Sequence, residues 1–184
     1  SRGVCAPIDA SRDVGRVYAG GYGMMDSYYS SYWGELPNGA IGTISGRIDA
    51  AGDIYGVSAT GDIPSTLTAG GGIADVSAKG SITGDITAGD NIGYLGGLSG
   101  SGSGTGSGFG GGGIWAGVYV DAAIDAGGDI TGVRAGQDIA GTIHAGRDLV
   151  LARASQNLNA TITAERDIGA LSAGRLPEYV YPTG

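Results

Sequence analysis

The sequence predicts an all-β parallel β-solenoid, a rod in which short strands stack coil upon coil. Aliphatic residues recur in blocks of ten and nine residues that alternate, so the internal period is nineteen. A fixed period of this length is typical of repeat architectures. The 184-residue chain also contains 40 glycines and has no 3.6-residue apolar period, and both observations argue against helices.

The repeat is clearest between Val120 and Ala173, where the blocks follow one another without interruption. Ten-residue blocks read aliphatic-x-x-x-aliphatic-x-Ala, and nine-residue blocks read aliphatic-x-x-aliphatic-x-Ala. Fourteen such blocks make seven coils, with Gly97 in place of one terminal Ala and Ala152 in place of one second aliphatic. The blocks begin at Val4, Val14, Ile44, Ile54, Ile63, Ile73, Ile82, Ile92, Val120, Ile130, Ile139, Leu149, Leu158 and Ile168.

The spacing within a block predicts which side chains point inward. Residues two apart on a strand share a face, so the ten-residue block should bury the alternate residues Ile139, Gly141, Ile143 and Ala145. In the nine-residue block the first two aliphatics are three apart, which predicts a bend followed by a short second strand. One coil cannot bury its apolar face alone, and stacking against neighbouring coils buries it.

One domain is expected, with two insertions and a tail outside the repeat. The first insertion, 20–43, is rich in tyrosine, and the second, 98–119, is a flexible Gly/Ser-rich segment of low complexity. Both follow a nine-residue block, so both should leave from the same corner of the rod. Pro177 and Pro182 stop the tail, 174–184, from joining a central strand. The coils themselves are expected at 4–19, 44–97 and 120–173.

Composition and single residues exclude several classes of function. A net charge of −8 argues against a nucleic-acid partner, and no apolar run is long enough to span a membrane. Cys5 is the only cysteine, so it is either free or bonded to another chain. His144, the only histidine, lies in an outward slot with no acid and nucleophile placed beside it. No catalytic residue and no cofactor are therefore expected.

A recurring polar residue directly precedes most nine-residue blocks. One interpretation is that these side chains cap tight turns by bonding their own backbone. The other is a calcium ladder, but calcium-binding solenoid repeats separate the Asp from the aliphatic by one residue, and here the two are adjacent. The sequence favours turn-capping and no metal. The residues are Asp13, Asp53, Asn91, Asp129, Asp148 and Asp167.

Aromatic residues gather in the first insertion and in the tail. They either cover a flank of the rod or form a contact surface for a partner protein or a glycan, since exposed Tyr and Trp make strong interfaces. The candidates for this surface are Tyr22, Tyr28, Tyr29, Tyr32, Trp33, Tyr179 and Tyr181.

The coils resemble the nineteen-residue haemagglutinin-type repeats of filamentous-haemagglutinin-like bacterial adhesins, in stretches such as AGGDITGVRAGQDI and AGRDLVLARA. That resemblance covers the fourteen blocks and implies a secreted, surface-exposed β-helical rod that displays adhesive elements. The two insertions and the tail depart from the plain repeat, and the sequence is expected to lack the amino-terminal secretion domain of that family. The chain is thus expected to be a fragment of a longer adhesin or a small protein built from the same coil.

Three functions follow as hypotheses. The leading one is a non-enzymatic structural subunit of an extracellular filament or surface fibre, made of copies joined head to tail. The in-frame blocks begin at Val4 and end at Ala173, and neither end of the repeat is guarded by lysine. The alternative is an adhesin-type module that binds glycan or a partner surface through the aromatic loop 20–43. A polysaccharide-acting enzyme is disfavoured, because the insertions carry Gly, Ser and Tyr instead of converging acids and bases.

Overall fold

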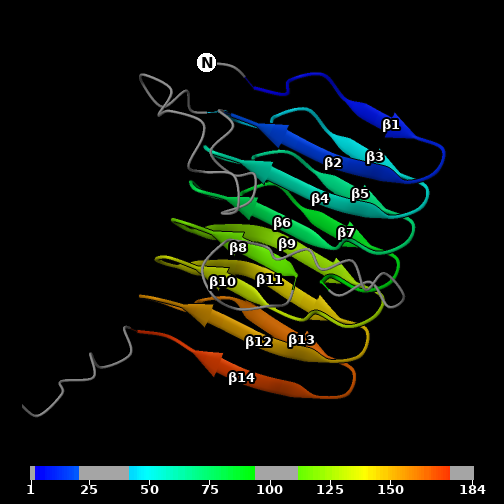
Figure 1. The fold of residues 1–184 in the computed structure, drawn as a ribbon. Coiled ribbons are helices and arrows are strands. Elements are labelled where there is room, and N and C mark those ends of the chain that lie inside the picture. The colour runs from blue at the N-terminus through cyan, green and yellow to red at the C-terminus, as the bar shows by residue number, and fades with distance from the viewer. Residues whose placement is uncertain (1–2, 21–41, 94–111, 175–184) are drawn as a thin grey trace, which may run out of the picture.

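The computed structural model describes residues 3–20, 42–93 and 112–174. Every regular element in these ranges is a β-strand, and all strand pairs are parallel. The strands form two seven-stranded sheets, so the predicted all-β parallel solenoid is confirmed (Figure 1).

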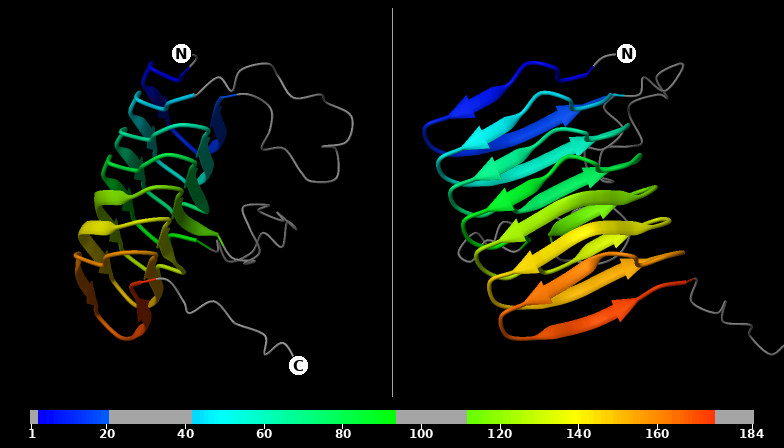
Figure 2. Two further views of the ribbon diagram at one scale, coloured as in Figure 1. Left: turned by 90° about the vertical axis from the view of Figure 1, so that its left-hand side faces the viewer. Right: turned by 180° about the vertical axis from the view of Figure 1, so that it is seen from behind.

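Each coil gives one strand to each sheet. The coils stack along one axis, so that the two sheets run along this axis as two layers (Figure 2). The first sheet consists of β1 (Ile8–Ala10), β3 (Ile48–Ala50), β5 (Leu67–Ala69), β7 (Ile86–Ala88), β9 (Val120–Ala126), β11 (Ile139–Ala145) and β13 (Thr161–Ala164). The second consists of β2 (Val14–Ala19), β4 (Ile54–Ala59), β6 (Asp75–Ala78), β8 (Gly113–Ala116), β10 (Val133–Ala135), β12 (Leu149–Ala154) and β14 (Ile168–Ser172).

The register places like residues on like residues from coil to coil. Ile143 pairs with Ile124 on one side and with Ile162 on the other, and the alanines that end each strand also stack. Isolated parallel bridges extend the same register where no full strand forms, as between Ile63 and Ile82. The nineteen-residue period is therefore the distance along the chain from one coil to the equivalent position in the next.

The aliphatic columns form the core between the two sheets. Ile139, Ile143 and Ala145 are buried as predicted, and the isoleucines at equivalent positions of the interior coils are fully buried as well. Full burial of one such side chain contributes about 1.5–3 kcal/mol, so the stacked columns are the main source of stability. Gly141 does not follow the prediction: it is exposed and adopts a positive φ of 87°.

The nine-residue blocks depart from strict alternation, as their spacing predicts. Ile130 forms isolated bridges and is separated from β10, the strand that begins at Val133. This separation gives the predicted bend and the short second strand. In β4 the strand is continuous, but Gly56 and Val57 are both buried although they are consecutive. Both arrangements allow the first and second aliphatics to point into the core.

The second insertion differs from the prediction in its position. Strand β8 lies inside the range 98–119, and its residues Ile114 and Ala116 are fully buried in the core. They pair with Val76 and Ala78 of the preceding coil and so occupy the slots that the spacing had assigned to residues 95 and 97. The described chain breaks between Gly93 and Gly112, so the insertion interrupts a nine-residue block instead of following it.

The two insertions also leave the rod at different points of the coil, not at the same corner. Gly20 and Gly93, which precede the breaks, have φ of 123° and 119°, and a Cβ at either would clash with a threonine of the next coil. Where the chain returns, Thr60 Oγ1 accepts a hydrogen bond of 2.9 Å from the Gly42 N–H. Thr131 Oγ1 donates one of 2.7 Å to the Gly112 carbonyl. Each threonine thus holds the base of one insertion.

Candidate functional site

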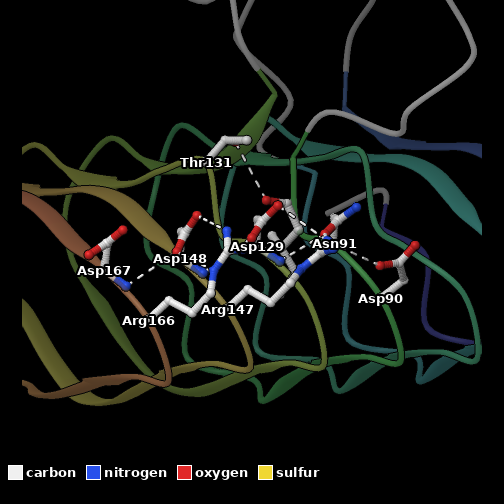
Figure 3. A network of polar contacts seen from close by, with 9 residues as sticks. Asp90, Asn91, Asp129, Thr131, Arg147, Asp148, Arg166 and Asp167 are labelled. Carbon is white, nitrogen blue, oxygen red and sulfur yellow. Dashed lines mark hydrogen bonds and ion pairs between the residues drawn. The ribbon is translucent and has the colours of Figure 1, made fainter.

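The Asp/Asn ladder (Asp13, Asp53, Asn91, Asp129, Asp148 and Asp167) runs along one corner of the solenoid. Figure 3 shows its members Asn91, Asp129, Asp148 and Asp167. Each bond of the ladder joins a side-chain oxygen of one coil to a backbone N–H of the next coil. Asp13 Oδ1 accepts from Asp53 N at 2.9 Å, and Asn91 Oδ1 accepts from Asp129 N at 2.7 Å. The bonds to Asp148 N and Asp167 N measure 3.1 and 3.2 Å.

This geometry corrects the predicted role of the ladder. The side chains were expected to bond the backbone of their own turn, but their partners lie nineteen residues further along, or 38 to 40 where an insertion intervenes. The ladder therefore cross-links consecutive coils at a corner where the two sheets do not pair. A hydrogen bond of this kind contributes about 0.5–1.5 kcal/mol.

A second set of such bonds, at the turn before the ten-residue blocks, was missed from the sequence. Asp62 Oδ1 accepts from Ser81 N at 2.8 Å, and Asp138 Oδ1 accepts from Asn157 N at 2.9 Å. Asn157 Nδ2 also donates to Asp138 at 2.8 Å. The signal was present in the sequence, because Asp62 and Asp138 each stand directly before an aliphatic, as the ladder residues do.

Arginines brace the C-terminal half of the Asp/Asn ladder from outside (Figure 3). Arg147 Nη2 lies 2.7 Å from Asn91 Oδ1 and 3.2 Å from Asp129 Oδ2. Arg166 makes two contacts with the Asp148 carboxylate, one of them from Nε at 3.0 Å. The hydrogen bond from Arg166 holds the pKa of Asp148 below its usual range, and the Asp167 N–H adds to this effect.

The two ends of the solenoid differ in how far they expose the apolar columns that the interior buries. Leu149 and Ala152 of β12 are 0% exposed, whereas Ile168 and Leu171, which pair with them in β14, are 44% and 47% exposed. At the other end Val14 and Val17 are 7% and 9% exposed, and the residues Val4 and Ile8 of the first coil are partly buried. Within the described residues, no further strand pairs with β13 or β14 on this side.

The remaining predicted site residues are not brought together by the described structure. The aromatic residues of 21–41 and the tail tyrosines Tyr179 and Tyr181 lie outside the described residues, so the contact surface stays a prediction. Cys5 is exposed and unpaired among the described residues. His144 Nδ1 lies 3.0 Å from Thr163 Oγ1 on the outer face of the first sheet.

In the ranges 3–20, 42–93 and 112–174, no group of three or more His, Cys, Asp or Glu side chains is placed to hold a metal ion. The same part of the chain contains no helix long and apolar enough to cross a membrane. Comparison with protein-family models, with curated proteins and with solved structures found no match. The resemblance to haemagglutinin-type repeats therefore remains a prediction.

Proposed function

We propose that the chain is a non-enzymatic structural subunit that stacks end to end through its terminal coils and builds an extracellular filament or surface fibre. The observation that supports this proposal is the exposure of Ile168 and Leu171 in the last coil, where the equivalent residues of β12 are fully buried. A solenoid whose last coil shows an apolar column and an unpaired strand edge offers a surface that another coil fits.

The two ends carry equivalent positions of one repeat, so the same register can continue from one copy to the next. Extension of the register beyond β13 and β14 would bring Ile168 against Val14 of a second copy and Leu171 against Val17. Covering a half-exposed aliphatic side chain contributes about 1 kcal/mol. Pairing of two edge strands with two others adds backbone hydrogen bonds. Since the contact joins different ends of identical chains, it does not close and propagates into a fibre.

The resemblance to haemagglutinin-type repeats implies a secreted rod on the cell surface. A fibre outside the cell agrees with this implication. A rod whose insertions leave and return at Gly20–Gly42 and Gly93–Gly112 would carry those segments at regular intervals along a filament. The solenoid would then be the scaffold that carries the insertions. No reaction chemistry is assigned to it.

Sedimentation velocity over a range of protein concentrations tests the proposal. The unmodified chain should show a weight-average sedimentation coefficient that rises with concentration. Leu171→Asp places a charge in the end column and should abolish that rise. The matched control is Val150→Asp, because Val150 is 54% exposed on the outer face of β12 and lies outside the stacking surface. A concentration-independent monomer for the unmodified chain would refute end-to-end stacking.

A further inference from the structure

The Asp/Asn ladder has a direction. In every bond the side-chain acceptor belongs to the earlier coil and the backbone donor belongs to the later coil. The two ends of the ladder therefore differ in chemistry. Within the described residues, the Asp167 carboxylate accepts no hydrogen bond from a later coil, and the Asp13 N–H donates none to an earlier one.

The arginines beside the ladder follow a second rule. Arg147 and Arg166 each stand directly before a ladder residue, and each pairs with the ladder carboxylate of the preceding coil. The partner of Arg147 is Asp129, at 3.2 Å, and the partner of Arg166 is Asp148. The two pairs thus have the same spacing, eighteen residues back along the chain.

Arg12 stands in the same position at the start of the rod. It directly precedes Asp13, it is exposed, and it makes no ion pair in the described part of the chain. Its backbone belongs to the same column, because the Gly52 N–H donates to the Arg12 carbonyl just as the Arg166 N–H donates to the Arg147 carbonyl. No preceding ladder carboxylate lies in the described part of the chain to pair with Arg12.

We propose that Arg12 of one copy pairs with Asp167 of the preceding copy, and that this contact fixes the direction and register of the stack. The proposal rests on the proposed end-to-end association. The joint then repeats the step between the last two coils: Arg12 takes the place of Arg166, and Asp167 takes the place of Asp148. The Asp13 N–H of the second copy donates to the Asp167 carboxylate, as the Asp167 N–H donates to Asp148.

Backbone bonds complete the same joint. Inside the rod, Leu149 N donates to the carbonyl of Asp167 in the next coil, at 2.9 Å. Ile168 is the next residue of this column and would donate to the Asp13 carbonyl of the second copy. The N–H of Arg12 would donate to the Arg166 carbonyl. A shift by one residue would lose all of these bonds and would turn the apolar column outward.

The pair also selects head-to-tail over tail-to-tail contact. Two C-terminal ends brought together would have no Arg12 at the joint, and two N-terminal ends would have no Asp167. Only the head-to-tail joint matches acid with base, so the charge pattern specifies the orientation that the apolar columns alone leave open.

Charge reversal provides the test. Arg12→Asp and Asp167→Arg are made separately and studied alone and in an equimolar mixture by sedimentation velocity and electron microscopy. Each variant alone would bring like charges together at every joint, and its association should weaken at least about tenfold. In the mixture, each end of one variant meets an oppositely charged end of the other. The mixture should therefore recover fibres in which the two variants alternate.

Controls separate the outcomes. Arg153→Asp and Asp125→Arg carry the same charge changes on outer faces within the rod and should associate like the unmodified chain. Thermal unfolding of each variant checks the fold. If a charge-reversal variant fails to fold, the neutral variant at the same position, Arg12→Ala or Asp167→Asn, is used in its place. Fibres from both single variants at unmodified strength, or a mixture that recovers nothing, would overturn the pairing while end-to-end stacking stands. A monomeric unmodified chain would overturn the stacking itself.

Discussion

The Asp53 carboxylate accepts a hydrogen bond of 2.8 Å from the backbone N–H of Gly72, in the next coil. Gly72 occupies the ladder position of its own coil but has no side chain with which to bond the coil that follows. The ladder is therefore interrupted between Gly72 and Asn91, where two adjacent coils are held at this turn by the backbone alone, through the bond from Ile73 N to the Asn91 carbonyl.

Gly72→Asn should restore the missing bond. The new amide oxygen would accept from the Asn91 N–H, as Asn91 accepts from Asp129, and should raise the free energy of unfolding by about 0.5–1.5 kcal/mol. Urea unfolding measures the change. Gly72→Ala is the control, since it also lowers the conformational entropy of the unfolded chain but supplies no hydrogen-bond acceptor. Equal stability of the Asn and Ala variants would show that the ladder bond contributes nothing there.

Ile143→Asp should prevent folding. Ile143 is 1% exposed and packs between Ile124 and Ile162, so the substitution buries an unpaired carboxylate between stacked coils. Circular dichroism should show loss of strand signal and of a cooperative melt. The neighbouring outward slot provides the control, because Asp125→Asn changes an exposed side chain and should melt like the unmodified chain. A normal melt for Ile143→Asp would contradict the assignment of inward positions.

Asp75 should make the stability depend on pH. Its carboxyl lies at the outer surface of β6, yet the surrounding protein desolvates it and raises its pKa from 3.8 to about 6, with Arg16 acting in the opposite direction. The folded state therefore binds this proton more tightly than the unfolded state. The stabilisation of the folded state by this proton is complete below about pH 4 and is lost as the pH rises through about 6.

Asp75→Asn should remove that dependence. The variant should gain melting temperature relative to the unmodified chain at pH 7, and the gain should shrink towards pH 4. Thermal melts across this range measure the difference, and Asp125→Asn accounts for the loss of one negative charge. A difference between variant and unmodified chain that stays constant from pH 4 to pH 7 would show that Asp75 is not desolvated in the folded state.

The inward aliphatics could be predicted because they depend only on the period. Every coil meets the same neighbours, so a residue such as Ile143 is buried wherever the repeat continues. The position of the second insertion could not be found in this way, because a coil can be interrupted at any turn and resumed later. The spacing from Ile92 pointed to residue 95, although Ile114 and Ala116 match the aliphatic-x-Ala pattern of the block end more closely.

The ladder shows a different limit. Its residues could be identified from their constant place before an aliphatic, but their partners could not. A side chain such as Asp129 is close both to its own turn and to the next coil, and the sequence does not distinguish the two. Only the three-dimensional stacking shows that the bonds run between coils, and hence that the ladder has two unlike ends.

The axial repeat of the assembled protein, measured by electron microscopy at neutral pH, tests end-to-end stacking most directly. Parallel strands lie about 4.8 Å apart, so seven coils per copy predict unbranched fibres with an axial repeat of about 34 Å. The repeat should be unaffected by concentration, because each copy adds one set of coils in unbroken register. Dispersed single rods at high concentration, or closed pairs that do not elongate, would contradict the account.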